Sequence, residues 1–534
     1  MKTMINSIIL ASCFALPLAS CSDSDAAPEQ KDWSTTTYFN SSDAAAQDTY
    51  YKPAVGYVGD PMPFFDPVAG DFKVLYLQDF RPNPEGTYHP IWGVSTKDAA
   101  HYTALGELVS CGTLKSQDAA IGTGSTIYDE ASKLYYTFYT GNKYKPTGDE
   151  SAQAVMVATS ADFKTWTKDR TFLLKGQDFG YDKNDFRDPF VFKGDDGKFH
   201  MLISTKKGGK GSLAEFVSDD LKNWTDNGVF MTMMWDRFYE CPDLFKMGDY
   251  WYLVYSEIHH AVRRVQYFKG RTLDELKACT ANDVARWPDA HEGFLDSRGL
   301  YAGKTASDGT NRYLWGWCPT RSGKDNTAVG ASPAEPEWAG NLVCYKLIQH
   351  EDGTLTLGQV DAVSEKYNQD VAVEVKESQN MTEADGTYTL AGNAEQPAYM
   401  LMGRLGSHNK ISFTVTTSNE WDKFGISMVR GSDSKKYYTM VVNPEDENNR
   451  KVNFEEQGVE GKGFIAGIDG YVFARPADNV YNITIYTDNS ICVMYINDVC
   501  SYTNRIYGIQ KNCWSINSYN GANVKISNLK ICQY

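Results

Sequence analysis

The chain has 534 residues, enough for two ordinary domains, and carries a formal net charge of −16. Proteins that bind nucleic acid display clustered Lys and Arg, so this balance argues against a nucleic-acid partner. The 34 Tyr and 12 Trp suit stacking on sugar rings, although they also suit β-sheet in general. The cysteines show no CxxC or Cys/His metal spacing, and no nucleotide or flavin motif occurs, so we predict no metal and no cofactor.

The N-terminus has the features of an export signal over residues 1–21. An apolar core spans Ile8 to Leu16, and the ending Leu18-Ala19-Ser20-Cys21 resembles a bacterial lipobox. That resemblance implies cleavage before Cys21 and lipid attachment to its thiol, with an ordinary secretory signal as the alternative. Residues 22–48 are polar and are predicted to be a flexible linker. We therefore expect an outer-membrane lipoprotein at the cell surface, or on the periplasmic face, that touches the membrane only through this anchor.

One strand–turn–strand pattern recurs along the next 300 residues at a spacing of roughly 55 to 65 residues. Each copy opens on a short polar segment and continues into a run of aromatic and β-branched residues. A helix is expected only near Leu273 to Ala285. Five such copies predict an all-β, five-bladed β-propeller over residues 49–350. The copies open at Asp60, Gly124, Arg187, Glu240 and Gly299.

The pattern changes after a predicted linker at residues 351–370. Runs such as Ile411–Val415, Phe424–Val429 and Tyr481–Tyr486 alternate in the manner of half-buried antiparallel strands. Residues 371–534 are therefore predicted to form a β-sandwich of a common domain size.

Three acids stand at the start of innermost strands, namely Asp60, Asp188 and Glu240. Innermost propeller strands converge on one axis, so these side chains should share a pocket. A single acid there is most simply a turn residue, but three in register favour a functional site. Glycoside cleavage needs one carboxyl group to protonate the leaving oxygen and another to attack the anomeric carbon or activate water. A third can stabilise the transition state, and neighbouring negative charge helps raise the pKa of the acid.

The residues around these acids resemble motifs of glycoside hydrolase family 32, the fructan hydrolases and invertases. Arg187-Asp188-Pro189 resembles the RDP motif of the family, and Glu240-Cys241-Pro242-Asp243 resembles its EC motif. Further segments follow in the family's order and extend the resemblance over nearly the whole mature chain. They are Trp92-Gly93-Val94-Ser95, Gly124-Ser125, Tyr301-Ala302 and Gly316-Trp317.

The resemblance implies a role for each acid. Asp60 is the expected nucleophile, Glu240 the general acid/base and Asp188 the transition-state stabiliser. A retaining glycosidase without cofactor or metal follows from this assignment.

Three more residues are implied to bind substrate. Arg187 is expected to pair with carboxylates or sugar hydroxyls, and Gln78 to bind the sugar at the cleavage point. Trp317 is expected to wall the pocket, with a buried sheet tryptophan as the alternative. Ser125 is interpreted as a strand-start residue rather than a ligand.

The first motif departs from the family pattern WMNDPNG. The chain reads Tyr57-Val58-Gly59-Asp60-Pro61-Met62-Pro63, so Asp60 and Pro61 remain while Gly59 replaces an asparagine. The resemblance implies that this asparagine binds the terminal fructose. We therefore expect intact catalytic machinery and altered sugar recognition.

The predicted activity is hydrolysis of β-fructofuranosidic bonds in levan, inulin, fructo-oligosaccharides or sucrose, with an oligo- or polysaccharide as partner. A related propeller enzyme acting on another sugar, such as an arabinoside, is the first alternative, and the altered first motif favours it. A non-catalytic glycan-binding surface lipoprotein is the second, and the three acids argue against it. Linkage preference, endo or exo action and oligomeric state stay open.

Overall fold

The computed structural model describes most of the chain from residue 49 onward. The predicted signal with Cys21 and the predicted linker 22–48 lie outside the described residues. Within the described ranges, no helix is long and apolar enough to cross a membrane. These ranges are 49–80, 88–233, 238–257, 264–283, 293–321, 336–393, 396–430, 437–444, 451–457, 471–473, 475–519 and 521–534.

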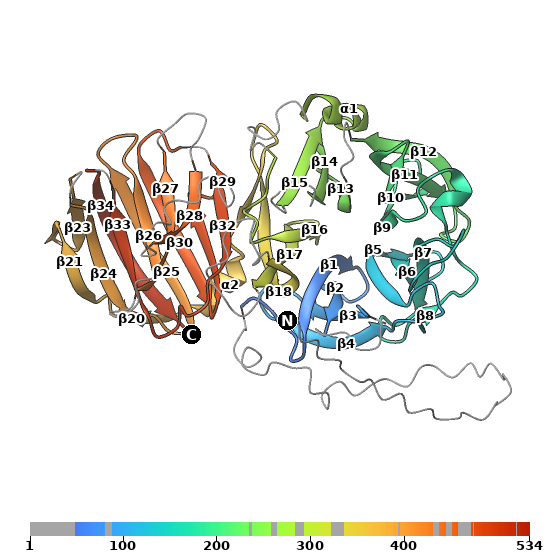
Figure 1. Cartoon of the computed structure of the whole chain (residues 1–534), viewed down its shortest axis with the longest axis horizontal. Coiled ribbons are helices and arrows are strands. Elements are labelled where there is room, and N and C mark those ends of the chain that lie inside the picture. The colour runs from blue at the N-terminus through green and yellow to red at the C-terminus, as the bar shows by residue number, and fades with distance from the viewer. Residues whose placement is uncertain are drawn as a thin grey trace, which may run out of the picture. The chain divides into compact units, whose positions relative to one another are not determined.

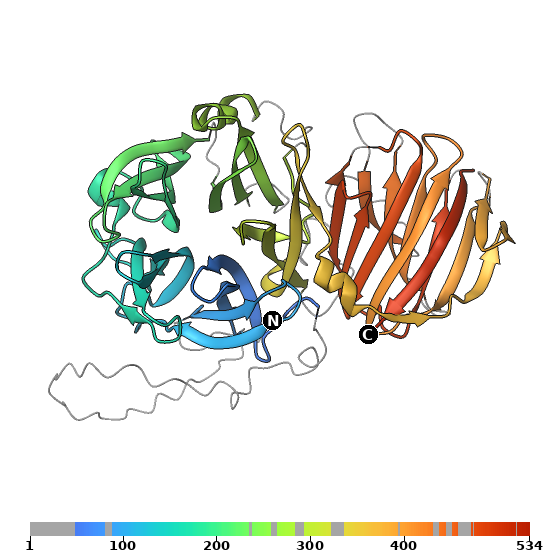
Figure 2. The same ribbon diagram turned by 180° about the vertical axis from the view of Figure 1, so that it is seen from behind.

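The first half forms five antiparallel blades around one centre, with the first and last joined in one sheet, which confirms the predicted five-bladed propeller (Figures 1 and 2). The first strand of each blade (β1, β5, β9, β13 and β16) lies nearest that centre in Figure 1. The first three blades have four strands each: β1 Tyr57–Asp66, β2 Asp71–Asp79, β3 Ile91–Thr96 and β4 Thr103–Val109; β5 Ala120–Asp129, β6 Leu134–Asn142, β7 Gln153–Ser160 and β8 Thr167–Lys168; β9 Phe186–Lys193, β10 Phe199–Lys207, β11 Lys210–Ser218 and β12 Thr225–Thr232.

The last two blades are less regular. In the fourth blade, three strands are followed by the predicted helix, α1, at Leu273–Asp283. The strands of the fourth and fifth blades are β13 Glu240–Met247, β14 Tyr250–Glu257 and β15 Arg264–Gly270; β16 Tyr301–Ser307, β17 Arg312–Arg321, β18 Pro336–Gln349 and β19 Leu355–Gly358. Earlier in the chain, a 3-10 turn, η3 at Gly176–Phe179, precedes the third blade.

The ring is closed by backbone pairing between the last blade and the first. β18 pairs with β17 along its length and also meets β1, where Gly340 lies opposite Val58. The Leu342 amide donates to the Tyr51 carbonyl at 2.8 Å. The first and last blades are therefore joined in one sheet.

The second strand of each blade is sandwiched between neighbouring sheets. In β2, every residue from Phe72 to Asp79 is buried, because blades pack face to face on both of its sides. The apolar runs found in the sequence are these strands.

The C-terminal half is a β-sandwich of two antiparallel sheets, as predicted. β25 shows why it forms: its residues alternate between half-buried and buried, and Ile411, Phe413 and Val415 enter the core. One sheet contains β20 Gln369–Val371, β22 Met381–Ala384, β23 Thr387–Ala391, β25 His408–Thr417, β30 Val480–Asp488, β31 Ile491–Ile496, β32 Cys500–Arg505 and β34 Asn523–Gln533. The other contains β21 Val375–Gln379, β24 Ala398–Arg404, β26 Phe424–Arg430, β27 Tyr437–Asn443, β28 Lys451–Gln457, β29 Tyr471–Val472 and β33 Cys513–Ser518.

The segment predicted as a linker, residues 351–370, carries regular structure. β19 pairs with β18 of the propeller, and the short helix α2 follows at Asp361–Lys366. β20 then begins at Gln369 and pairs with β34 of the sandwich.

Candidate active site

A β-bulge interrupts every one of the five innermost strands at the same place. In four blades, two residues stand opposite one on the second strand, and in β5 the extra residue is Thr123. A bulge stops the alternation of side chains between the two faces and re-aims the residues beside it. The bulges are Asp60-Pro61, Thr123, Asp188-Pro189, Cys241-Pro242 and Ala302-Gly303.

The backbone of these bulges is strained. Asp60, Asp188, Cys241 and Ala302 have positive φ angles of 30°, 58°, 51° and 52°. A non-glycine residue held at positive φ is uncommon, and such residues gather at functional sites. Proline follows three of them, which a sheet tolerates at a bulge because no ladder hydrogen bond is needed there.

The bulges define two rings of residues around the propeller axis. The bulge ring consists of Asp60, Thr123, Asp188, Cys241 and Ala302. The pre-bulge ring, one residue earlier on each strand, consists of Gly59, Gly122, Arg187, Glu240 and Tyr301.

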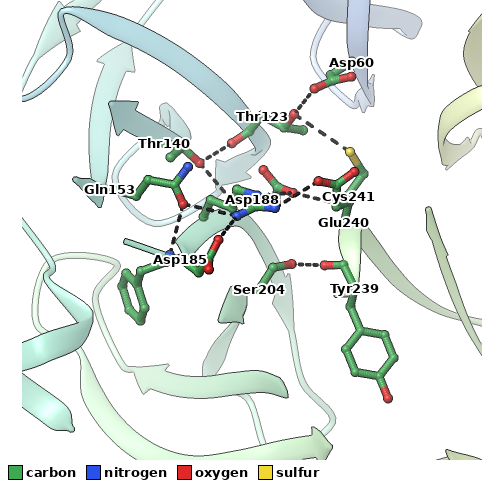
Figure 3. Close-up of polar contacts among 12 residues, drawn as sticks. Asp60, Thr123, Thr140, Gln153, Asp185, Asp188, Ser204, Tyr239, Glu240 and Cys241 are labelled. Atoms are coloured by element: carbon green, nitrogen blue, oxygen red, sulfur yellow. Dashed lines mark hydrogen bonds and ion pairs between the residues drawn. The ribbon is translucent and has the colours of Figure 1, made fainter. Parts of the chain in front are cut away.

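The expectation that the three acids share one register is wrong by one residue. Asp60 and Asp188 belong to the bulge ring, whereas Glu240 belongs to the pre-bulge ring, and Cys241 takes the bulge position of its blade. The sequence spacing could not show this, because the bulge decides which residue turns inward. The acids nevertheless lie in one region, to which the first, third and fourth blades each contribute one, as Figure 3 shows.

Asp60 is held by two hydrogen bonds from two other blades. Thr123 Oγ1 donates to its Oδ2 at 2.7 Å, and Trp317 Nε1 donates to its Oδ1 at 3.0 Å. Burial raises the pKa of Asp60, and these two donors oppose the rise because they favour the ionised carboxylate. Both oxygens are thus oriented before any ligand binds.

Glu240 lies between a cation and a phenol in the pre-bulge ring. Arg187 Nη2 donates to its Oε1 at 2.9 Å, and the Tyr301 hydroxyl donates to its Oε2. Arg187 also reaches Asp185 at 2.6 Å and lies over the Phe238 ring, 3.8 Å from its centroid. The guanidinium therefore fixes the carboxylate from the third blade while Tyr301 fixes it from the fifth.

Asp188 is the most deeply buried of the three acids, with 4% of its surface exposed. Its Oδ2 accepts the Cys241 amide at 3.0 Å, and its own amide donates to Thr140 Oγ1 at 2.8 Å. Burial raises the pKa of Asp188 to about 6, with Arg187 opposing the rise and Glu240 adding to it. The ionised form consequently dominates only above that pH.

A buried lysine lies behind the two rings and was not predicted. Lys304 is 2% exposed, and its Nζ donates to the Gly124 carbonyl at 2.8 Å. Burial lowers its pKa, and the nearby acids Asp243, Asp188 and Asp60 oppose that change. This cation compensates part of the negative charge gathered on the axis. Within the described ranges, no group of three or more His, Cys, Asp or Glu could hold a metal ion.

The three predicted substrate-binding residues have different surroundings. Arg187 lies in the site as described, and Trp317 is fully buried yet bonds to Asp60. Gln78 is fully buried on β2 opposite Val58, where its Nε2 donates to the Val55 carbonyl at 2.6 Å. Within the described ranges, no hydrogen bond joins Gln78 to the three acids, and its role as a sugar ligand stays a prediction. Ser125 ties two blades together, since its hydroxyl donates to the Pro189 carbonyl and accepts the Val191 amide, each at 2.9 Å.

Sequence reasoning missed Thr123, the extra residue in the β5 bulge that bonds to Asp60. A signal was present, because Thr123 directly precedes the Gly124-Ser125 segment. Tyr301 belongs to the Tyr301-Ala302 segment, which by itself assigns it no role. Lys304 and Trp338 left no signal, because Gly124 and Gly59, which they meet, lie in other blades.

Comparison with known protein families accounts for nearly all of the described chain. Residues 50–360 match the model for the glycosyl hydrolases family 32 N-terminal domain. Residues 353–531 match the model described as GH32, BT1760-like, C-terminal domain.

Individual relatives are more distant. The chain is 25% identical over 320 residues to the beta-fructofuranosidase, insoluble isoenzyme CWINV2, of Arabidopsis thaliana, covering 54% of this chain and 51% of that protein. It is 25% identical over 217 residues to the sucrose-6-phosphate hydrolase of Vibrio alginolyticus, covering 39% of this chain and 41% of that protein. The match therefore spans about half the length of these relatives or less. The crystal structure of exo-inulinase from Aspergillus awamori superposes with a TM-score of 0.67 at 15% identity, covering 93% of this chain and 99% of that one, which shows a shared fold.

Proposed function

The chain belongs to the glycosyl hydrolases of family 32, and on that premise we propose that it hydrolyses β-fructofuranosidic bonds in fructans, fructo-oligosaccharides or sucrose. The observation that supports this proposal best is the convergence of Asp60, Asp188 and Glu240 from three blades onto one axis. Each carboxylate is held by donors from another blade. An oligo- or polysaccharide is the proposed partner.

Asp60 is the proposed nucleophile. Thr123 and Trp317 each occupy one of its oxygens and favour the ionised form, which is the form that attacks the anomeric carbon. Attack breaks the bond to the leaving oxygen and forms a covalent fructosyl–Asp60 ester. Water later cleaves that ester, so the configuration is retained.

Glu240 is the proposed general acid and base. It gives its proton to the leaving oxygen in the first step and takes one from water in the second. Arg187 and Tyr301 hold both of its oxygens, so these two residues position it. Asp188, ionised above pH 6, is proposed to stabilise the positive charge that develops on the sugar ring.

The direct test is sugar release from levan, inulin, sucrose and an arabinan panel. Fructose or fructo-oligosaccharides from the wild type, and not from Asp60→Asn or Glu240→Gln, would support the activity and both roles. Asp249→Asn and Glu351→Gln change exposed carboxylates and serve as matched controls that should keep full turnover. Following the anomer of the first product by NMR tests retention.

Each other outcome contradicts the proposal in a defined way. Arabinose in place of fructose would move the activity to another sugar. Glycan binding by the wild type without turnover would indicate a non-catalytic binding protein. Unchanged turnover in Glu240→Gln would remove the acid/base assignment.

We also propose that the protein is exported and anchored by lipid at Cys21. Support comes from the apolar stretch before the lipobox-like Leu18-Ala19-Ser20-Cys21 ending. Radiolabelled fatty acid should be incorporated into the wild type and not into Cys21→Ala. Protease added to intact cells should remove the protein if it is displayed at the surface and spare it on the periplasmic face.

A further inference from the structure

The residue before the proposed nucleophile has no side chain, and an indole ring lies in the space that such a side chain would take. A Cβ atom on Gly59 would lie 2.2 Å from Cη2 of Trp338, 2.7 Å from Cζ2 and 2.8 Å from Cζ3. No real Cβ atom approaches carbon that closely. A larger residue at position 59 therefore requires the Trp338 ring to move.

Position 59 belongs to the pre-bulge ring. The members of that ring in the third, fourth and fifth blades are Arg187, Glu240 and Tyr301, and their side chains bond to one another in the site. Gly59 holds the same register in the first blade. A side chain there would start from the position that, in those three blades, supplies groups to the site.

Trp338 is connected to the nucleophile through a second tryptophan. Its ring packs against that of Trp317, with centroids 6.1 Å apart, and Trp317 Nε1 donates to Asp60. The His89 ring stacks on Trp338 with centroids 4.1 Å apart and an interplanar angle of 25°. Trp317 is fully buried, whereas Trp338 and His89 are only partly buried. The stacked rings of Trp338 and His89 therefore stay partly open to solvent.

We propose that Trp338 is a specificity-determining residue that replaces the side chain of position 59 in the wall beside Asp60. Beside Gly59 of the first blade, β18 of the last blade then offers the fructosyl unit an apolar ring instead of a polar group. Apolar contact with the sugar ring replaces a hydrogen bond to a hydroxyl on this side of the site. This inference rests on the proposed function, because it assumes that the fructosyl unit binds beside Asp60.

The test is a reciprocal exchange between positions 59 and 338. Gly59→Asn alone should lower kcat/KM on the best fructan by about 100-fold, because its amide collides with the indole. Trp338→Ala alone should raise KM by about 10-fold with a smaller change in kcat, since it removes a binding wall and leaves the carboxylates in place. In the double variant, the asparagine has room, and kcat/KM should recover at least about 10-fold over Gly59→Asn.

Two further variants complete the design. Trp338→Phe keeps an aromatic ring and should stay within a few-fold of the wild type. Trp421→Ala removes a tryptophan that is 39% exposed on the sandwich, and should change neither constant.

The melting temperatures of the wild type, Gly59→Asn, Trp338→Ala and the double variant separate this inference from the proposed function. Recovery of the melting temperature in the double variant reports the packing of Trp338 on Gly59 whether or not any fructan is cleaved. A wild type that cleaves no fructoside would defeat the proposed function and, with it, the role in fructosyl recognition. If fructans are cleaved but the double variant loses kcat/KM by the product of the two single losses, then Trp338 does not determine specificity. The same conclusion follows if Gly59→Asn keeps the kcat/KM of the wild type.

Discussion

The inner ends of the propeller strands and the core of the sandwich bury different chemistry. On the propeller axis, Asp188, Asp243 and Lys304 are at most 4% exposed, and the two acids oppose the fall that burial causes in the pKa of Lys304. The main core cluster of the sandwich is built from apolar side chains, among them Ile411, Ile485 and Ile516. Burying charges beside one another costs stability unless every charge is compensated, whereas burying apolar surface stabilises the fold.

The sandwich also buries a charged side chain, but this one donates hydrogen bonds to neutral acceptors, among them backbone carbonyls. Arg505 on β32 is 3% exposed and donates to the carbonyls of Cys318 and Pro319 at 2.8 and 3.0 Å. It also donates to Asn341 and Ser490 at 2.7 and 2.9 Å. Arg505 therefore bonds to neutral acceptors, whereas the propeller places several carboxylates close together. Such a cluster of carboxylates lowers stability locally and is typical of a functional site.

The largest expected effect comes from removing a charge on the axis. Asp188→Asn should lower kcat by roughly 10²–10³-fold, because it removes a preorganised charge. The amide oxygen can still accept the Cys241 amide, so the fold is kept. The activity and the urea midpoint of the variant should be measured between pH 4 and 8.

The same variant should be more stable than the wild type at neutral pH. The pKa of Asp188 is raised in the fold from an ordinary 3.8 to about 6, so the folded state binds the proton more tightly than the unfolded state. Ionising it in the fold costs about 3 kcal/mol, fully so above pH 6. The advantage of Asp188→Asn should shrink as pH falls through 6 and vanish below about 4. A variant less stable than the wild type at pH 8 would contradict this comparison.

Arg505→Met should remove the buried hydrogen bonds of Arg505 and leave the three acids of the propeller unchanged. Four buried hydrogen bonds are lost, at roughly 1 kcal/mol each, so we expect about 4 kcal/mol less stability. Urea titration measures this, and Arg404→Met, which removes an exposed arginine of β24, is the control. An unchanged urea midpoint would show that the four hydrogen bonds of Arg505 do not contribute to stability.

Thr123→Val should lower kcat/KM by about 10-fold, since it deletes one hydrogen bond to a charged group at nearly constant volume. The lost donor favoured ionised Asp60, so the pKa of Asp60 rises further and the acidic limb of the kcat/KM profile moves to higher pH. Thr126→Val, within the same strand β5, is a control away from Asp60. An acidic limb that stays in place would mean that Thr123 does not orient Asp60, the proposed nucleophile.

The smallest effect is expected in the sandwich core. Ile516→Val removes one buried methyl group, which should cost about 1 kcal/mol of stability and leave kcat and KM unchanged. Denaturant and kinetic measurements on one preparation test both halves. A change in kcat would show that the sandwich core is coupled to the site.

Much of the architecture followed from local pattern. Alternation in Ile411–Val415 predicted a half-buried strand, and β25 buries the alternate residues Ile411, Phe413 and Val415 as expected. The repeat of short strands predicted the five blades, because each blade is one local antiparallel unit. The regular structure of β19 and α2 in residues 351–370 did not follow, since β19 is stabilised by pairing with β18.

The candidate site followed only in part. Asp60, Asp188 and Glu240 were found from the repeat, but their two-ring arrangement depends on bulges, which are set by pairing with the second strand of each blade. Thr123 and Tyr301 bond to acids of other blades, so short-range sequence could not assign them.

By itself, the sequence determined which strands form and which acids stand near their starts, because both are properties of neighbouring residues. The tertiary structure alone decided which of those residues turn toward the axis, that Lys304 lies behind them and that Trp338 covers Gly59. The physical reason is that bulge register, burial of charge and ring packing depend on atoms that come together only when the five blades close.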